Sequence, residues 1–308
     1  MTRSSASGKI ILFGEHAVVY GRPALAVPVT QVQANVDISD SSRRGIWIKA
    51  PDVGLNAELN TLPSDHPVAS VIHNFLFLAR VSQFPNLEIN IASTIPVASG
   101  LGSGAAVTVA LTRALASHLN YLITDEEVNA FTYEIEKLHH GTPSGIDNTV
   151  VTYGRPVYFV KDQPIETFNA GKPFTILIAD TGISAPTKES VGDVRRLWMN
   201  DRSRLETVFD KIGEISFTAR RAIEAGKPEL LGELMNENHA ILRTLTVSSP
   251  ELDTLVEVAR RAGAPGAKLS GGGRGGNMIA LVEPENAETV SLALKEAGAT
   301  NTIITRVV

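Results

Sequence analysis

The sequence predicts an α+β protein of two domains, and three observations support this. The chain has 308 residues, which favours two hydrophobic cores over one. Strand and helix patterns alternate in the first half, whereas the second half groups long helices beside short strands. Helices segregated beside a sheet are typical of α+β layers. We place the boundary near Gly171-Lys172-Pro173, which gives domains 1–171 and 172–308.

The first half mixes predicted strands and predicted helices. Residues 18–37 are rich in strand-forming side chains, and a further strand is expected over 45–50. An amphipathic helix is expected over 65–81. Residues 87–91 alternate apolar and polar side chains, which indicates a half-buried strand, and 105–119 show helical spacing.

A capping box begins the next predicted helix. Thr124 is followed by Glu127 three positions later, so each side chain can bond the other's backbone N–H at the amino end of a helix. This helix is expected to run to about His139, with Glu136 near its end.

The second half opens with a predicted strand and closes with another. Helices and strands are expected over 174–179 (strand), 203–225, 228–244 and 250–262 (helices), 278–282 (strand), 285–297 (helix) and 302–307 (strand).

Composition restricts the class of protein. The hydrophobic fraction of 43% supports full cores, and the net charge of −5 offers no electrostatic case for binding nucleic acid or an anionic membrane. The absence of cysteine rules out disulfides and thiolate metal sites and fits a cytoplasmic protein. No stretch approaches about 20 uninterrupted apolar residues, and the amino terminus has no signal-type apolar core.

A Gly/Ser-rich segment lies between the strand at 87–91 and the helix at 105–119. It runs Pro96-Val97-Ala98-Ser99-Gly100-Leu101-Gly102-Ser103-Gly104-Ala105-Ala106. A strand, a glycine loop and a helix start together direct free backbone N–H groups and the positive end of a helix dipole at an anion. The segment lacks the Lys-Ser/Thr of a Walker A loop, and by itself it is also compatible with a flexible turn.

Asp147 follows a second run of turn-forming residues, His140-Gly141-Thr142-Pro143-Ser144-Gly145-Ile146. Gly and Pro at this density predict a defined loop, with Asp147 at its tip and aimed at a substrate hydroxyl. The alternative is an Asx-type turn in which Asp147 bonds its own backbone.

A third glycine-rich segment comes near the end of the chain and runs Lys268-Leu269-Ser270-Gly271-Gly272-Gly273-Arg274-Gly275-Gly276-Asn277. It leads directly into the apolar strand at 278–282, which argues against a linker. We therefore expect that it lets another loop or a ligand approach closely.

The amino-terminal segment Gly8-Lys9-Ile10 to Gly14-Glu15-His16 places a lysine on a short buried strand and an acid and a histidine at a turn. The alternative to a functional role is that Lys9 is a solvated residue at the end of the strand and that His16 is a structural residue.

Together the four segments resemble the small-molecule kinase superfamily named for galactose, homoserine, mevalonate and phosphomevalonate, and among its members the mevalonate kinases most. The resemblance spans the full chain, and residues 8–21 and 140–148 are its most specific parts. It implies an N-terminal domain like ribosomal protein S5 domain 2 and a C-terminal ferredoxin-like domain.

The sequence departs from the family pattern at two places. The family loop usually reads Gly-Leu-Gly-Ser-Ser-Ala, and Gly104 replaces its second serine, so either Ser103 or a water takes the hydroxyl role. Arg274 and Asn277 stand where small residues are usual. Arg274 either contacts phosphate or points into solvent.

The resemblance implies ATP- and Mg²⁺-dependent phosphorylation of the primary hydroxyl of mevalonate, in isoprenoid biosynthesis. Asp147 and Lys9 would be catalytic, with Asp147 taking or orienting the hydroxyl proton. Ser103 and Glu136 would hold Mg²⁺. The remaining implied contacts are to ATP (Pro96, Ser99, Gly100, Leu101, Gly102, Ser103, Gly104, Ala105), to the acceptor (Lys9, Glu15, His16, Ser144, Asp147, Thr187) and through the third motif (Ser270, Gly271, Gly272, Gly273).

Several alternatives stay open. Glu15 would otherwise pair with a basic residue, Glu136 would be a solvated helix position, and Thr187 would be a plain helix start. A related kinase acting on phosphomevalonate, homoserine or a sugar would share the loops, although Ala17-Val18 after Gly-Glu-His differs from the Thr-Asp of galactokinases. A non-catalytic ATP and metabolite sensor is the other class. Family analogy suggests a homodimer.

Overall fold

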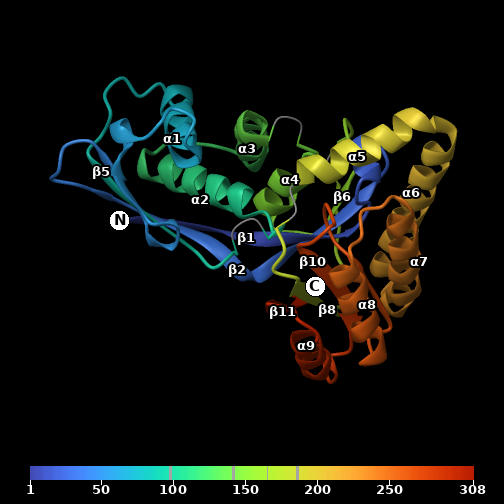
Figure 1. The fold of residues 1–308 in the computed structure, drawn as a ribbon. Coiled ribbons are helices and arrows are strands. Elements are labelled where there is room, and N and C mark those ends of the chain that lie inside the picture. Colours follow the sequence, from blue (N-terminus) through green and yellow to red (C-terminus); the bar gives the residue numbers. More distant parts are fainter. Residues whose placement is uncertain (97–98, 141–142, 165, 185–186) are drawn as a thin grey trace. The chain divides into compact units, whose positions relative to one another are not determined.

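The computed structural model describes residues 1–308 except 97–98, 141–142, 165 and 185–186 (Figure 1). Two compact units are present, and each is discontinuous in sequence. Unit 1 comprises Met1–Gly8, Val32–Val97 and Leu101–Gly154, and unit 2 comprises Lys9–Gln31, Ala98–Gly100 and Arg155–Val308. The strands β1 (Thr2–Phe13) and β2 (Ala24–Asp40) contribute residues to both units. The domain boundary near Gly171 remains a prediction.

Unit 1 is a sheet covered by helices. Its strand order is β4 (Leu55–Glu58), β3 (Ile46–Ala50), β5 (Leu87–Ser93) and β2, with β3 and β5 parallel and β5 and β2 antiparallel. Figure 1 shows α1 and α2 over one face of these strands. The helices are α1 (Pro67–Leu78), α2 (Ser103–His118), α3 (Asp125–His140) and α4 (Ile146–Tyr153), with short 3₁₀ turns η2 (Pro51–Val53) and η3 (Leu59–Thr61).

The capping box is confirmed at the start of α3. The Thr124 N–H donates to Glu127 Oε2 at 2.8 Å, and the Glu127 N–H donates to Thr124 Oγ1 at 3.2 Å. Two backbone donors that the helix leaves unpaired are thereby satisfied, which explains why the helix begins at this position.

Unit 2 contains an antiparallel sheet of four strands in the order β11 (Asn301–Val307), β8 (Phe174–Asp180), β10 (Asn277–Val282) and β9 (Gly266–Leu269). Numbered along the chain, this order is 4-1-3-2, the ferredoxin-like arrangement that the resemblance implies. The unit also contains η1 (Ala17–Tyr20), α5 (Thr187–Asn200), α6 (Arg202–Glu224), η4 (Pro228–Leu230), α7 (Leu231–Thr244), α8 (Pro250–Arg261), α9 (Ala287–Glu296) and the pair β6 (Val157–Phe159) and β7 (Glu166–Thr167).

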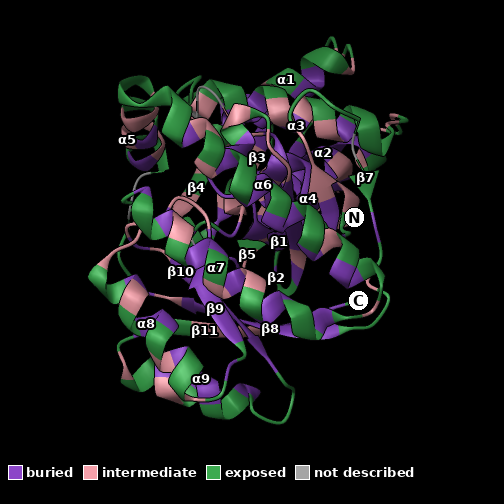
Figure 2. Ribbon diagram, turned by 90° about the vertical axis from the view of Figure 1, so that its right-hand side faces the viewer, coloured by how far each residue is buried: buried purple, intermediate pink, exposed green. Residues whose placement is uncertain are grey.

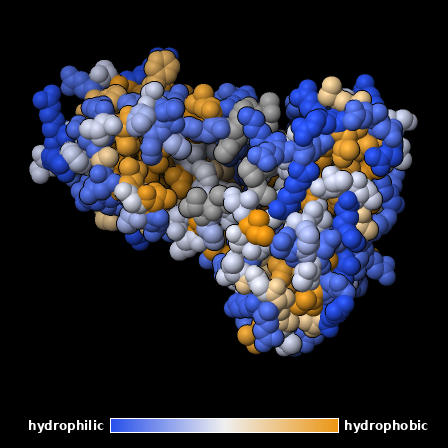
Figure 3. Space-filling model, viewed as in Figure 1, coloured by the Kyte–Doolittle hydropathy of each residue, from blue (hydrophilic) through white to orange (hydrophobic). Residues whose placement is uncertain are grey.

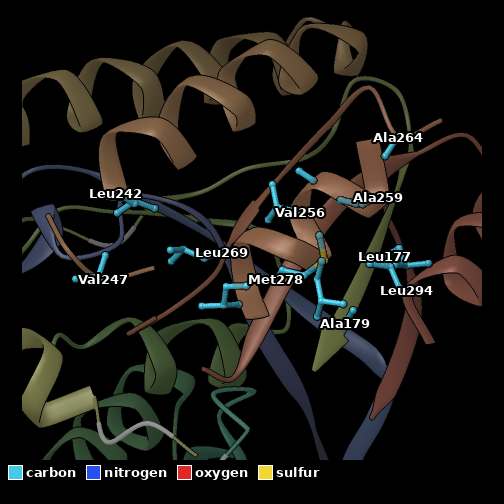
Figure 4. Packing of buried hydrophobic residues seen from close by; sticks show 14 of the residues in the cluster. Leu177, Ala179, Leu242, Val247, Val256, Ala259, Ala264, Leu269, Met278 and Leu294 are labelled. Atoms are coloured by element: carbon cyan, nitrogen blue, oxygen red, sulfur yellow. The ribbon is translucent and has the colours of Figure 1, made fainter. Parts of the chain in front are cut away.

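The core of unit 2 lies between this sheet and its helices. All six residues of β10, an inner strand of this sheet, are buried (Figure 2). Leu177 and Ala179 of β8 point toward Val256 and Ala259 of α8 and Leu294 of α9 (Figure 4). Hydrophilic residues cover most of α6 and α7 on the face in Figure 3, so these helices present polar sides to solvent.

The predicted strands and long helices are present within a few residues of their expected ends, except that the stretch expected as strand from residue 18 begins with η1, and its strand starts only at Ala24. The sequence reading missed α4, β4, β6, β7 and β9, and it left α5 as one possibility at Thr187. Within the part of the chain that the structure describes, no helix is both long and apolar enough to cross a membrane.

Candidate active site

The amino end of α2 forms the part of the phosphate loop that belongs to unit 1. Gly102 precedes the helix with φ 74°, and its carbonyl accepts the first helical hydrogen bond, from the Ala106 N–H at 2.9 Å. The N–H groups of Ser103, Gly104 and Ala105 therefore have no partner inside the helix, and Gly102 has no side chain to cap them. Such a helix start favours an anion. Val97 and Ala98 of this motif lie outside the described residues.

Asp147 lies in the first turn of α4 and not at the tip of a loop, so this expectation was wrong. The turn-forming run ends at Gly145, which has φ 92° and precedes the helix. The Thr149 hydroxyl donates to the Gly145 carbonyl at 2.6 Å, and the Ile146 N–H donates to the Ser144 hydroxyl at 3.3 Å. A carboxylate in the first turn is favoured by the helix dipole. Gly141 and Thr142 of this motif lie outside the described residues.

A side-chain contact fixes α4 against α3 within unit 1. The amide nitrogen of Asn148 donates to Asn129 Oδ1 at 2.7 Å. Because Asn148 follows Asp147 directly, this contact sets the orientation of the turn that carries the acid. The rigid helix positions Asp147 better than a loop would.

Glu136 is buried near the end of α3, with 9% of its surface exposed. Its neighbour Glu134 is exposed and pairs with Lys137 at 2.6 Å. The solvated position is therefore that of Glu134. The described residues include no group of three or more His, Asp or Glu side chains suited to a metal ion, so a cation here would need additional oxygens from its substrate.

In unit 2, Lys9 is buried on β1, and its ammonium donates to the Gly100 carbonyl at 2.9 Å. The alternative of a solvated flank is therefore wrong. This bond joins β1 to the Ser99–Gly100 end of the phosphate loop, which is 91 residues away in sequence.

Glu15 is buried in unit 2. Its carboxylate pairs with the Lys268 ammonium, and both side chains are 0% exposed. The Asn238 amide donates to the second Glu15 oxygen at 3.2 Å, and Lys268 also donates to the Leu269 carbonyl at 2.7 Å. Burial raises the pKa of Glu15 and lowers the pKa of Lys268, and their mutual attraction opposes both shifts. The alternative of a basic partner is therefore confirmed, and a contact of Glu15 with the acceptor stays a prediction.

His16 is buried in a left-handed turn with φ 62°, next to the glycine-rich third motif. Its Nε2 lies 3.1 Å from the Gly272 carbonyl, which can only accept, so Nε2 carries the proton. Burial lowers the pKa of His16 to about 4, and the imidazole is neutral at pH 7. Its Nδ1 is buried without a partner among the described residues, and it can accept a hydrogen bond from a hydroxyl.

The third motif lets other parts of unit 2 approach closely, as predicted. A Cβ at Gly273 would overlap the Val247 carbonyl. The Ser270 hydroxyl donates to the Ile11 carbonyl of β1 at 2.7 Å, and the Asn277 amide donates to the Ser99 carbonyl of the phosphate loop. Lys268 itself lies on β9, not in a loop.

Thr187 is the first residue of α5, so the alternative of a helix start is confirmed. The implied site residues divide between the two units. Unit 1 contains Pro96, Leu101, Gly102, Ser103, Gly104, Ala105, Glu136, Ser144 and Asp147, and unit 2 contains Lys9, Glu15, His16, Ser99, Gly100, Thr187, Ser270, Gly271, Gly272 and Gly273.

Sequence reasoning assigned no role to Lys268 and did not identify Asn238 or Asp193. One signal was available for Lys268. It stands between apolar residues in Gly266-Ala267-Lys268-Leu269, and a charge buried in a strand requires a partner.

Comparisons with known proteins cover both halves of the chain. Residues 68–155 match the GHMP kinases N terminal domain, and residues 219–300 match the GHMP kinases C terminal domain. A mevalonate kinase of Pyrococcus abyssi is 37% identical over 324 residues, covering 99% of this chain and 95% of the relative. The crystal structure of L. major mevalonate kinase in complex with R-mevalonate is similar, with a TM-score of 0.87 at 29% identity, covering 100% of this chain and 96% of that one. The Methanococcus jannaschii mevalonate kinase has a TM-score of 0.86 at 26% identity, covering 99% and 96%.

Proposed function

The chain belongs to the GHMP kinase family, and from that premise we propose that it transfers the γ-phosphoryl group of ATP to the primary hydroxyl of mevalonate, giving 5-phosphomevalonate. The observation that carries the choice of acceptor is the similarity, over nearly the whole chain, to proteins named mevalonate kinase. The apolar Ala17-Val18 after Gly14-Glu15-His16 also suits a methyl-bearing acceptor better than a sugar.

ATP phosphates bind at the Gly/Ser loop in this proposal. The N–H groups at the start of α2 that have no partner inside the helix are suited to the phosphate oxygens, and the hydrogen bond from Lys9 to Gly100 supports the other end of the loop. The proposed contacts are Pro96, Ser99, Gly100, Leu101, Gly102, Ser103, Gly104 and Ala105.

Asp147 is the proposed base. The acceptor hydroxyl oxygen bonds to the γ-phosphorus as the bond from that phosphorus to the ADP oxygen breaks, and the hydroxyl proton passes to the Asp147 carboxylate. Lys9 is the proposed second catalytic group, whose positive charge favours the developing negative charge. The first-turn position of Asp147 on α4 supports this role, because it holds the acid on a rigid element.

Glu136 and Ser103 are the proposed Mg²⁺ ligands. Their carboxylate and hydroxyl oxygens are the hard donors that Mg²⁺ prefers. When bound, Mg²⁺ neutralises charge on the transferring phosphates.

The proposed acceptor contacts are His16, Ser144 and Thr187, together with Lys9 and Asp147. The neutral His16, with its proton on Nε2, accepts from a hydroxyl and does not bind the acceptor carboxylate. By family analogy we also expect a cytoplasmic homodimer, and light scattering of the purified chain measures the oligomeric state.

The test is an assay of ADP release with Mg-ATP and, in parallel, mevalonate, phosphomevalonate, homoserine and galactose. Turnover with mevalonate alone supports the proposal, and turnover with another acceptor instead overturns the choice of substrate. ATP binding without turnover on any acceptor would favour a sensor. Asp147→Asn, which is nearly isosteric, should lose several orders of magnitude in kcat while still binding ATP, and activity within about 10-fold of the parent would remove Asp147 from the chemistry.

A further inference from the structure

Arg274 occupies a backbone conformation that favours glycine. It has φ 61°, within a loop whose glycines 271, 273, 275 and 276 also have positive φ. A residue with a side chain is less stable than glycine in this region, and a compensating interaction would offset that cost.

The Arg274 side chain provides that interaction by reaching α5. Its guanidinium pairs with the Asp193 carboxylate, and its Nε donates to the Thr246 carbonyl at 3.3 Å. The Arg274 backbone N–H donates to the Val247 carbonyl at 2.7 Å. Both alternatives from the sequence, a phosphate contact and a solvent-exposed side chain, are replaced by this ion pair between the loop and the helix.

The first turn of α5 lies directly against the same loop. A Cβ at Gly272 would lie 3.0 Å from Thr187 Oγ1 and 3.2 Å from Ser190 Oγ, so any larger residue there would crowd this turn. The Gly272 carbonyl in turn accepts from His16. Gly272 therefore lies next to two of the proposed acceptor contacts, Thr187 and His16.

We propose that the Arg274–Asp193 ion pair is a latch that holds the first turn of α5 against Gly272 and thereby positions Thr187 for the acceptor. Arg274 and Asp193 are positioning residues that act through Thr187. This inference rests on the proposed function for the identity of the acceptor, but the latch itself rests only on contacts within unit 2.

The kinetic test compares Arg274→Gly, Asp193→Asn and the double variant. Glycine suits the left-handed backbone at 274, so the loop keeps its conformation and only the side chain is lost. Arg196→Ala is the matched control, because Arg196 pairs with the same Asp193 carboxylate from within α5 and is 73% exposed. Each latch variant should raise KM for mevalonate about tenfold, with kcat and KM for ATP within about twofold, and the double variant should equal either single one.

A second measurement separates failure of the latch from failure of the proposed function. Amide hydrogen exchange of α5 in the substrate-free protein should be about tenfold faster in Arg274→Gly and Asp193→Asn than in the parent or Arg196→Ala. Unchanged exchange in the latch variants would overturn the latch, whatever the acceptor. The positioning role would be overturned if exchange were faster but KM rose equally for mevalonate and for ATP. It would also be overturned if exchange were faster and the effects of the two substitutions on KM were additive in the double variant. If the parent does not phosphorylate mevalonate, the exchange result still decides whether the latch exists.

Discussion

Lys268→Met should destabilise the protein strongly, because it leaves a buried carboxylate without its counter-charge. Glu15 and Lys268 are both 0% exposed, so no water replaces the lost ammonium. Removing one partner of a buried pair costs about 3–5 kcal/mol. The Asn238 amide continues to donate to Glu15 at 3.2 Å, which places the expected cost at the lower end, about 3 kcal/mol.

The double variant Glu15→Gln/Lys268→Met separates charge from packing. Methionine keeps the length of the lysine stem, and glutamine keeps the shape of the glutamate, so only the charges and one or two hydrogen bonds are lost. We expect the double variant to cost about 1 kcal/mol, which is about 2 kcal/mol less than Lys268→Met alone. Urea denaturation followed by circular dichroism measures all four free energies of unfolding.

The pH dependence of stability gives a further test of Lys268→Met. The Lys268 ammonium lowers the pKa of Glu15, whereas burial raises it. Without the ammonium, burial acts unopposed by this charge, and the pKa of Glu15 is higher than in the parent. The folded state then holds more protons than the unfolded state above pH 4.5, and its stability falls as pH rises. Lys268→Met should therefore be less destabilising at pH 5 than at pH 7. A cost below about 1 kcal/mol, or a double variant as unstable as Lys268→Met, would refute the reasoning.

Three further predictions concern the metal and pH. Glu136→Gln should raise the Mg²⁺ concentration for half-maximal activity by about tenfold or more, whereas the exposed control Glu134→Gln should not; an unchanged titration would remove Glu136 from the metal site. Gly104→Ser should fold normally, since a Cβ there meets nothing within 4 Å, and should lower the Mg²⁺ requirement about twofold or more; a raised requirement contradicts the proposed site. The pKa of His16 is about 4 in the folded chain, whereas its ordinary value is 6.5. Between these two pH values the unfolded state binds more protons than the folded state, so the free energy of unfolding falls on acidification. The loss from pH 7 to pH 5 is about 2 kcal/mol, and His16→Gln should reduce this slope in urea titrations; an unchanged slope would assign the pH dependence to other groups.

Local patterns predicted those elements whose causes are local. The start of α3 follows from Thr124 and Glu127, three residues apart, and the helix over 105–119 follows from its own apolar spacing. The α4 helix was missed because its start depends on Gly145, which reads as part of a turn, and because the Asn148–Asn129 contact that fixes it joins two segments. The same reason placed Asp147 on a loop.

The sequence by itself determined the α+β class, the order of the four glycine-rich or charged segments and the family that they resemble. Those features depend on the spacing of residues close together in the sequence and on motifs whose residue types occur in few other kinds of site. The tertiary structure alone decided which side chains meet. Glu15 and Lys268 are 253 residues apart, and Asp193 and Arg274 are 81 apart, so no local periodicity could pair them. Folding brings these charges out of water, and a buried charge is stable only beside its opposite.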